Sequence, residues 1–151
     1  MFEQEKRFSI TNKTNDKLAR TITRLGRLPS LPARTSRFGT GGPFVKMKEK
    51  ILGKSYSLSL NFVGVKKIKT LNSKYRKIDR PTDILSFPLS KKDGEIFICP
   101  KIANIKAVEF QRSQKNFFAF LFIHGLTHLL GHDHSRKMEA VENKYRKYFH
   151  I

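Results

Sequence analysis

The pattern of apolar and polar residues predicts three strands between residues 55 and 100. In SYSLSLNFVG, residues 55–64, apolar side chains such as Leu58 and Phe62 alternate with serine and asparagine. This period of two predicts a strand with one covered face. Two further apolar runs, ILSFPL at 84–89 and EIFICP at 95–100, are separated by turn residues. We therefore expect these two strands to pair antiparallel.

Helical spacing of apolar residues predicts five helices around these strands. They cover residues 44–52, 66–77, 101–112, a longer segment that includes 117–130, and 135–149. Residues 117–130 are apolar on nearly all sides and too few to span a bilayer, so we expect a buried helix. Ser135 is expected to cap the last helix. The order of elements predicts an α+β fold with a small mixed β-sheet packed against several helices.

The first 42 residues have a different composition. They contain one possible amphipathic stretch, DKLARTITRLGRL, followed by a segment rich in Pro, Gly, Ser and Arg. Such a segment has little to bury and predicts a flexible linker. We therefore divide the chain into a basic, flexible N-terminal extension at 1–42 and a folded domain at 43–151. The extension is interpreted either as a tail without a specific task or as an arm that holds RNA.

The charge of the chain indicates a polyanionic partner. Lys and Arg total 31 against 12 acidic residues, a net charge of +19. Residues 1–54 carry 13 basic and 4 acidic side chains, and residues 55–151 carry 18 and 8, so the folded part is itself basic. This balance favours nucleic acid, although general solubility or an anionic membrane surface would also account for it.

The single cysteine bears on the compartment. Cys99 is the only cysteine, so no intrachain disulfide can form. A chain without disulfides fits a reducing compartment, and the first residues contain no apolar run typical of a secretory signal. We expect a cytoplasmic protein with Cys99 as a small core residue.

Histidines concentrate in HGLTHLLGHDH, residues 124–134. On a helix, His124 and His128 lie one turn apart on the same face. Gly131 can end the helix in the left-handed conformation, which allows His134 to supply a third ligand. Three neutral imidazoles leave a fourth position for water, as in catalytic zinc sites. The spacing predicts one zinc ion per chain, bound at the end of the long buried helix.

The residues between these histidines leave alternatives open. Asp133 is interpreted either as a carboxylate that orients one imidazole or as a cap at the turn. His132 is interpreted as a surface residue or a substrate contact. Gly125 stands where the metzincin pattern H-E-x-x-H-x-x-G-x-x-H has its glutamate, and peptide hydrolysis needs such an acid–base group. A metallopeptidase is therefore the alternative reading, weakened further because Met138 lies too close to the last histidine for a Met-turn.

Two segments resemble the YbeY family of bacterial endoribonucleases. LNSKYRKIDRPTDILSFP, residues 71–88, is similar to L-N-x-x-Y-R-x-x-D-x-P-T-D-V-L-S-F, and HGLTHLLGHDH is similar to H-G-x-L-H-L-x-G-Y-D-H. Between them, GEIFIC at 94–99 resembles the family's G-D-I-x-I-S/C strand. The resemblance extends from about Phe44 to the C-terminus. The sequence departs from the family pattern at Glu95, Thr127 and His132.

The resemblance implies an α+β hydrolase with a zinc ion held by His124, His128 and His134. It also implies metal-dependent cleavage of single-stranded RNA in ribosomal RNA maturation and ribosome quality control, particularly of the small subunit. A third hypothesis is a non-catalytic ribosome-associated protein whose zinc is structural. Only an assay separates this hypothesis from the enzyme.

The resemblance places Arg76 on the motif arginine associated with activity. A guanidinium can engage two phosphoryl oxygens at once, which suits a catalytic role at a scissile phosphate. The alternative is an ion pair with Asp79 or Asp83 that stabilises the fold. Basic residues around Arg76 either line a groove for an RNA backbone or form a solvated helix face. As candidate substrate-binding residues we select Lys74, Lys77 and Arg80.

Overall fold

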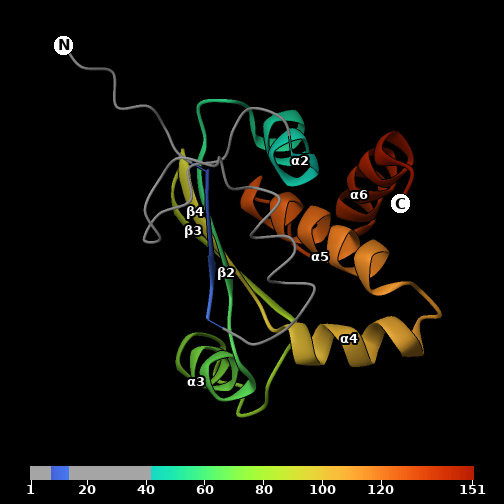
Figure 1. The fold of residues 1–151 in the computed structure, drawn as a ribbon. Coiled ribbons are helices and arrows are strands. Elements are labelled where there is room, and N and C mark those ends of the chain that lie inside the picture. The colour runs from blue at the N-terminus through green and yellow to red at the C-terminus, as the bar shows by residue number, and fades with distance from the viewer. Residues whose placement is uncertain (1–7, 14–41) are drawn as a thin grey trace, which may run out of the picture.

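A four-stranded mixed sheet forms the centre of the computed structural model, which describes residues 8–13 and 42–151 (Figure 1). The strands are β1 (Phe8–Asn12), β2 (Ser57–Phe62), β3 (Ile84–Ser90) and β4 (Asp93–Ile98), and their order in the sheet is β1-β2-β4-β3. β2 pairs in parallel with both β1 and β4, whereas β3 pairs antiparallel with β4. The predicted mixed sheet and its hairpin are therefore confirmed.

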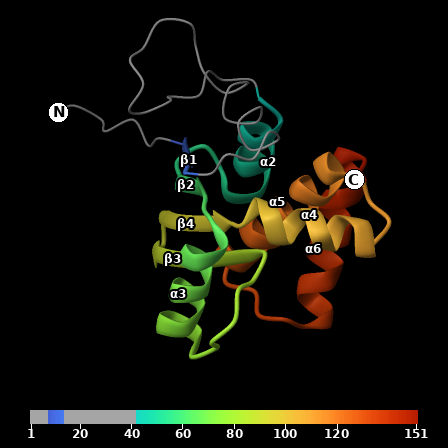
Figure 2. The same cartoon turned by 60° about the horizontal axis from the view of Figure 1, so that its bottom comes forward.

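Five helices within the described ranges pack around this sheet. They are α2 (Pro43–Leu52), α3 (Val65–Arg76), α4 (Pro100–Glu109), α5 (Gln114–Leu129) and α6 (Arg136–Phe149). Figures 1 and 2 show α3 on one face of the sheet, with α2, α4, α5 and α6 on the other. The predicted α+β class is confirmed. None of the helices in the described part of the chain is long and apolar enough to cross a membrane.

The main core lies between α5 and the sheet. The alternation in β2 buries Leu58, Leu60 and Phe62, as the sequence pattern predicts. Phe62 meets Phe118 of α5 with ring centroids 5.9 Å apart, and Phe118 and Phe122 are completely buried. Burial of each such side chain stabilises the fold by roughly 1.5–3 kcal/mol relative to exposure. This core holds α5 in place, and with it the histidines near the end of the helix.

A smaller core lies on the opposite face, beneath α3. Ile68 of α3 packs there against Leu85 of β3 and against Cys99, all fully buried. Burial raises the pKa of the Cys99 thiol, which keeps it protonated. Cys99 is thus the small core residue that the composition predicts. Because apolar side chains cover both faces of β3, this strand connects α3 on one side with α5 on the other.

The structure includes one strand that the sequence pattern did not predict. β1 lies inside the stretch assigned to the N-terminal extension, so ordered structure includes five residues ahead of Phe44. The strand has five residues, and Ile10, which pairs with Leu60, is buried. Five residues are too few for their apolar–polar pattern to stand out in the sequence. The amphipathic stretch and the linker, residues 14–41, lie outside the described residues.

Candidate metal centre

The end of α5 and the turn after it bring three histidines together. Ser113 caps the start of α5 by accepting a hydrogen bond from the Asn116 backbone N–H. His124 and His128 lie one turn apart near the other end of the helix. Gly131 then takes a left-handed conformation with φ of 89°, and the chain turns back to place His134 beside them. One ring nitrogen from each histidine lies within 4.8 Å of the other two, so the group could hold a metal ion.

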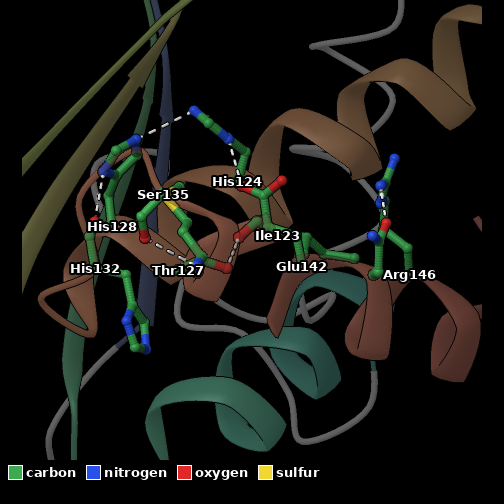
Figure 3. A network of polar contacts seen from close by, with 10 residues as sticks. Ile123, His124, Thr127, His128, His132, Ser135, Glu142 and Arg146 are labelled. Carbon is green, nitrogen blue, oxygen red and sulfur yellow. Dashed lines mark hydrogen bonds and ion pairs between the residues drawn. The ribbon is translucent and has the colours of Figure 1, made fainter. Parts of the chain in front are cut away.

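Hydrogen bonds orient two of these rings (Figure 3). The Nδ1 atom of His124 lies 2.5 Å from Oε1 of Glu142, and Nδ1 of His128 lies 3.0 Å from the backbone carbonyl oxygen of His132. A carbonyl or an ionised carboxylate can only accept a hydrogen bond, so Nδ1 is the donor in both rings. The Nε2 atom of each neutral ring therefore carries a lone pair.

The two lone pairs face the same point. The Nε2 atoms of His124 and His128 are 3.2 Å apart. Two lone pairs at this distance repel unless a cation lies between them. A tetrahedral zinc ion with Zn–N bonds of ~2.0–2.1 Å holds its ligand nitrogens roughly 3.3 Å apart. The donor set and its spacing therefore fit a divalent cation of this kind.

The environment of His128 favours its neutral form. Burial lowers the pKa of His128, and the nearby His124, His134 and Arg76 lower it further. The hydrogen bond to the His132 carbonyl acts in the opposite direction. A metal ligand must be neutral imidazole, so these effects prepare His128 to bind a cation without first losing a proton.

Position 125 faces the sheet, away from the ligands. A Cβ atom at Gly125 would lie 2.9 Å from Oγ of Ser86 and 3.0 Å from the Cδ1 atoms of Ile84 and Ile96. A side chain here would meet β3 and β4 at once, so glycine lets α5 lie close to the sheet. A glutamate at this position would start toward the sheet and away from the three histidines, and the neighbouring side chains would have to shift to accommodate it.

Arg76 is the last residue of α3 and is exposed. Asp79 pairs with Lys69 at 3.5 Å, and Asp83 pairs with Lys106 at 3.0 Å. Within the part of the chain that the structure describes, Arg76 forms no ion pair. The alternative role as a fold-holding partner of Asp79 or Asp83 is therefore absent there, while the charge of Arg76 is close enough to affect His128.

The other candidate RNA contacts are exposed and differ in setting. Lys74 lines a hollow of about 490 Å³ on α3. The residues around it are Lys66, Lys69, Thr70, Ser73, Lys74 and Asp79. Lys77 takes a left-handed conformation after α3 and donates to the Lys74 carbonyl at 3.2 Å, whereas Arg80 accepts a hydrogen bond from Asn72 through its own carbonyl. Neither Lys77 nor Arg80 lines the hollow.

The sequence pattern missed Glu142 as part of the centre. Orienting an imidazole was one of the two roles considered for Asp133, but this residue is exposed. The carboxylate that contacts a histidine ring of the group belongs to Glu142 of α6. His132 participates through its backbone carbonyl. The available signal was the spacing of α6, because Glu142 lies one turn after the buried Met138 and so shares its inward face.

The fold and the site define a small α+β protein in which three histidines, one of them hydrogen-bonded to a carboxylate, could hold one metal ion. The family model described as Endoribonuclease YbeY matches residues 43–149. The chain belongs to the YbeY family. The match begins at the first residue of α2 and ends at the last residue of α6.

Individual relatives agree with the family match. Proteins named Endoribonuclease YbeY from Oenococcus oeni and Buchnera aphidicola are 36% and 35% identical to this chain over 105 and 116 residues. These alignments cover 62% and 67% of this chain, and 69% and 75% of the respective relatives. A relative of the same name from Thermotoga maritima is 41% identical over 91 residues, which are 55% of this chain and 61% of that relative. The match thus spans less than two thirds of the Thermotoga relative.

A solved structure supports the fold. The solution structure of a Thermotoga maritima protein is similar to this chain with a TM-score of 0.54 and 33% sequence identity. The similarity covers 70% of this chain and 78% of that structure.

Proposed function

We propose that this protein is a zinc-dependent endoribonuclease that cleaves single-stranded regions of ribosomal RNA during small-subunit maturation and ribosome quality control. The observation that carries the proposal is the convergence of three imidazole nitrogens within 4.8 Å. The family supplies the reaction class, which is cleavage of RNA. The net charge of +19 suits a polyanionic substrate.

The site suits phosphodiester chemistry. Negative charge gathers on the phosphoryl oxygens in the transition state, so cationic groups stabilise it without a carboxylate base. His124, His128 and His134 would hold a zinc ion, which when bound would supply a Lewis acid and an ionisable water near neutral pH. Arg76 carries the role of steadying the scissile phosphate, since its guanidinium is exposed, without an ion pair among the described residues, and electrostatically close to His128.

Substrate contacts extend this proposal along α3. Lys74 and its basic neighbours around the hollow would bind the RNA backbone, with Lys77 and Arg80 at the end of the helix. Such contacts carry no sequence information and act through charge. We place the protein in the cytoplasm, where the free, buried Cys99 would stay reduced.

The close approach of α5 to the sheet argues against a peptidase. Gly125 has no carboxylate to transfer protons during peptide hydrolysis, and its position faces the sheet and not the three histidines. The RNA reaction has no such requirement, because metal and guanidinium provide the stabilisation.

The test compares His128→Ala with His132→Ala. Purified protein is first analysed for zinc and then incubated with structured ribosomal RNA and, separately, with a peptide pool. We expect His128→Ala to lose bound zinc and all RNA cleavage. His132→Ala should keep both, because its backbone carbonyl, and not its ring, contacts His128.

Each result has a defined meaning. Cleavage of RNA alone, lost with His128, supports the endoribonuclease. Peptide cleavage would establish the metallopeptidase instead. A zinc-loaded protein that cleaves neither would point to the non-catalytic ribosome-associated protein.

A further inference from the structure

We propose that Glu142 is a positioning residue of the metal centre. Its carboxylate holds His124 as the Nδ1–H tautomer and aims the Nε2 lone pair at the cation. The inference rests on the proposed function only in taking His124, His128 and His134 as ligands.

The contact is short and shielded from water. Oε1 of Glu142 lies 2.5 Å from Nδ1 of His124, and the two side chains are 12% and 23% exposed (Figure 3). A hydrogen bond to an ionised acceptor is stronger than one between neutral groups, and partial burial strengthens it further. The contact therefore selects the tautomer of His124 more firmly than water would.

A buried carboxylate needs a reason to be there. Glu142 is 9% exposed, one of five polar or charged residues that are buried within the described ranges. Removing a carboxylate from water is costly unless a hydrogen-bonded partner offsets the loss. The partner of Glu142 is a ring whose other nitrogen faces the metal site, so its burial serves the site directly.

The packing of α6 against α5 fixes the alignment of Glu142 with His124. One turn before His124, the Phe120 ring stacks on it with centroids 6.5 Å apart. One turn after Glu142, the Arg146 guanidinium lies over the Phe120 ring, 5.2 Å from its centroid. The two helices thus form two successive contacts, Phe120 with Arg146 and His124 with Glu142. A slip of one residue along either helix would remove both.

The start of α6 connects His134, the third histidine, to the helix that carries Glu142. Ser135, directly after His134, caps α6 by accepting a hydrogen bond from the Met138 backbone N–H. The same short segment therefore delivers one ligand and, two turns later, the carboxylate that orients another. Carboxylates in this position commonly raise metal affinity 10–100-fold.

A purely structural ion pair between α5 and α6 is the competing explanation. It would stabilise the metal-free protein but would leave metal affinity unchanged. The test therefore measures zinc affinity, by competition with a chromophoric chelator, alongside the melting temperature of the metal-free protein. The variants are Glu142→Ala and Glu142→Gln, with Glu139→Gln as the control, because Glu139 lies on the same helix and is exposed.

We expect Glu142→Ala to weaken zinc binding about 10–100-fold. The zinc affinity of Glu142→Gln should lie between those of Glu142→Ala and the unmodified protein, since the amide oxygen still accepts a hydrogen bond from Nδ1–H but carries no charge. The control should bind zinc as the unmodified protein does. A Glu142→Ala protein that melts at a lower temperature yet binds zinc with full affinity would overturn the proposal.

A second measurement needs no variant and applies even if Glu142→Ala does not fold. Nitrogen-15 NMR of the histidine rings in metal-free protein reports the tautomer of His124 directly. The Nδ1–H form is expected, and the Nε2–H form would overturn the proposal. RNA cleavage at saturating zinc is measured separately: its absence in the unmodified protein would reject the endoribonuclease while leaving the zinc result valid.

Discussion

The three histidines and the exposed basic residues of α3 supply the metal ligands and the positive charge that the proposed reaction needs, and their surroundings differ. In the centre, hydrogen bonds to Glu142 and to the His132 carbonyl align His124 and His128, both partly buried. On α3, the side chains of Lys74 and Arg76 are exposed. In the proposed reaction, the metal ligands would thus come from a fixed part of the molecule, and the positive charge that attracts RNA would come from exposed side chains.

The difference follows from what each task demands. Metal ligation depends on nitrogen positions within a few tenths of an ångström, so the rings need supporting contacts. Attraction of a phosphate backbone depends on charge over several ångströms, and long flexible side chains provide that without a fixed geometry. Arg76 stands between the two, because it is exposed like the lysines yet close enough to act on His128.

Replacing Arg76 tests this intermediate position and should have the largest effect. We expect Arg76→Ala to lower the rate of RNA cleavage about 10²–10³-fold, the usual loss when one transition-state donor is removed. Arg76→Lys should recover only part of it, since an ammonium cannot engage two oxygens in the same plane. Zinc content and melting temperature should not change. A parallel loss of thermal stability would move Arg76 from the reaction to the fold.

A larger residue at position 125 would disturb the packing of α5, which carries two of the histidines, and not the exposed side chains of α3. A valine there must displace Ser86 and the two isoleucines of the sheet, so we expect Gly125→Val to lower the free energy of unfolding by about 1–3 kcal/mol. Urea denaturation of the metal-free protein measures this loss. Gly64→Ala serves as a comparison without a clash, because a Cβ there has nothing within 4 Å, and its own small cost comes from the N-cap position of α3. Equal stability of the two variants would show that α5 can move away from the sheet freely.

Removing one lysine from the hollow should have the smallest effect and should leave the centre intact. We expect Lys74→Ala to weaken RNA binding modestly and to reduce the slope of log K against log salt by ~0.7, as for one phosphate contact on a single strand. Lys46→Ala on α2 removes the same charge on the other side of the sheet and serves as the control. Identical salt slopes for both variants would assign binding to net charge, without a defined surface on α3.

Local patterns were sufficient to predict most of the fold. The alternation in β2, the hairpin of β3 and β4, and the glycine turn after α5 each depend on neighbours in sequence, and all three are present. β1 escaped prediction because its pairing with β2 is a contact between residues some fifty positions apart. The helix expected over 101–112 ends earlier, at Glu109, because Gln111 takes a positive φ.

The same limit applies to the site, where local spacing could be predicted from the sequence and contacts between distant segments could not. The spacing of three histidines is a local property, and it placed them correctly near one point. Glu142 comes from another helix, so its contact with His124 depends on how α6 packs against α5. The sequence also could not decide whether Arg76 pairs with Asp79 or Asp83. Only the folded structure shows that Asp79 pairs with Lys69 and Asp83 with Lys106.

The place of β1 at the border of the sheet has a consequence for any shortened form of this protein. Its backbone pairs with β2 from Leu58 to Phe62, and Ser9 Oγ lies 3.2 Å from Ser59 Oγ. A fragment limited to the family-matched residues 43–149 would uncover a row of unbonded amides and carbonyls along β2. Such a border readily accepts a strand from another molecule. Removing β1 would therefore leave the edge of β2 open to pairing with a second molecule, whereas β3, the opposite edge of the sheet, would be unaffected.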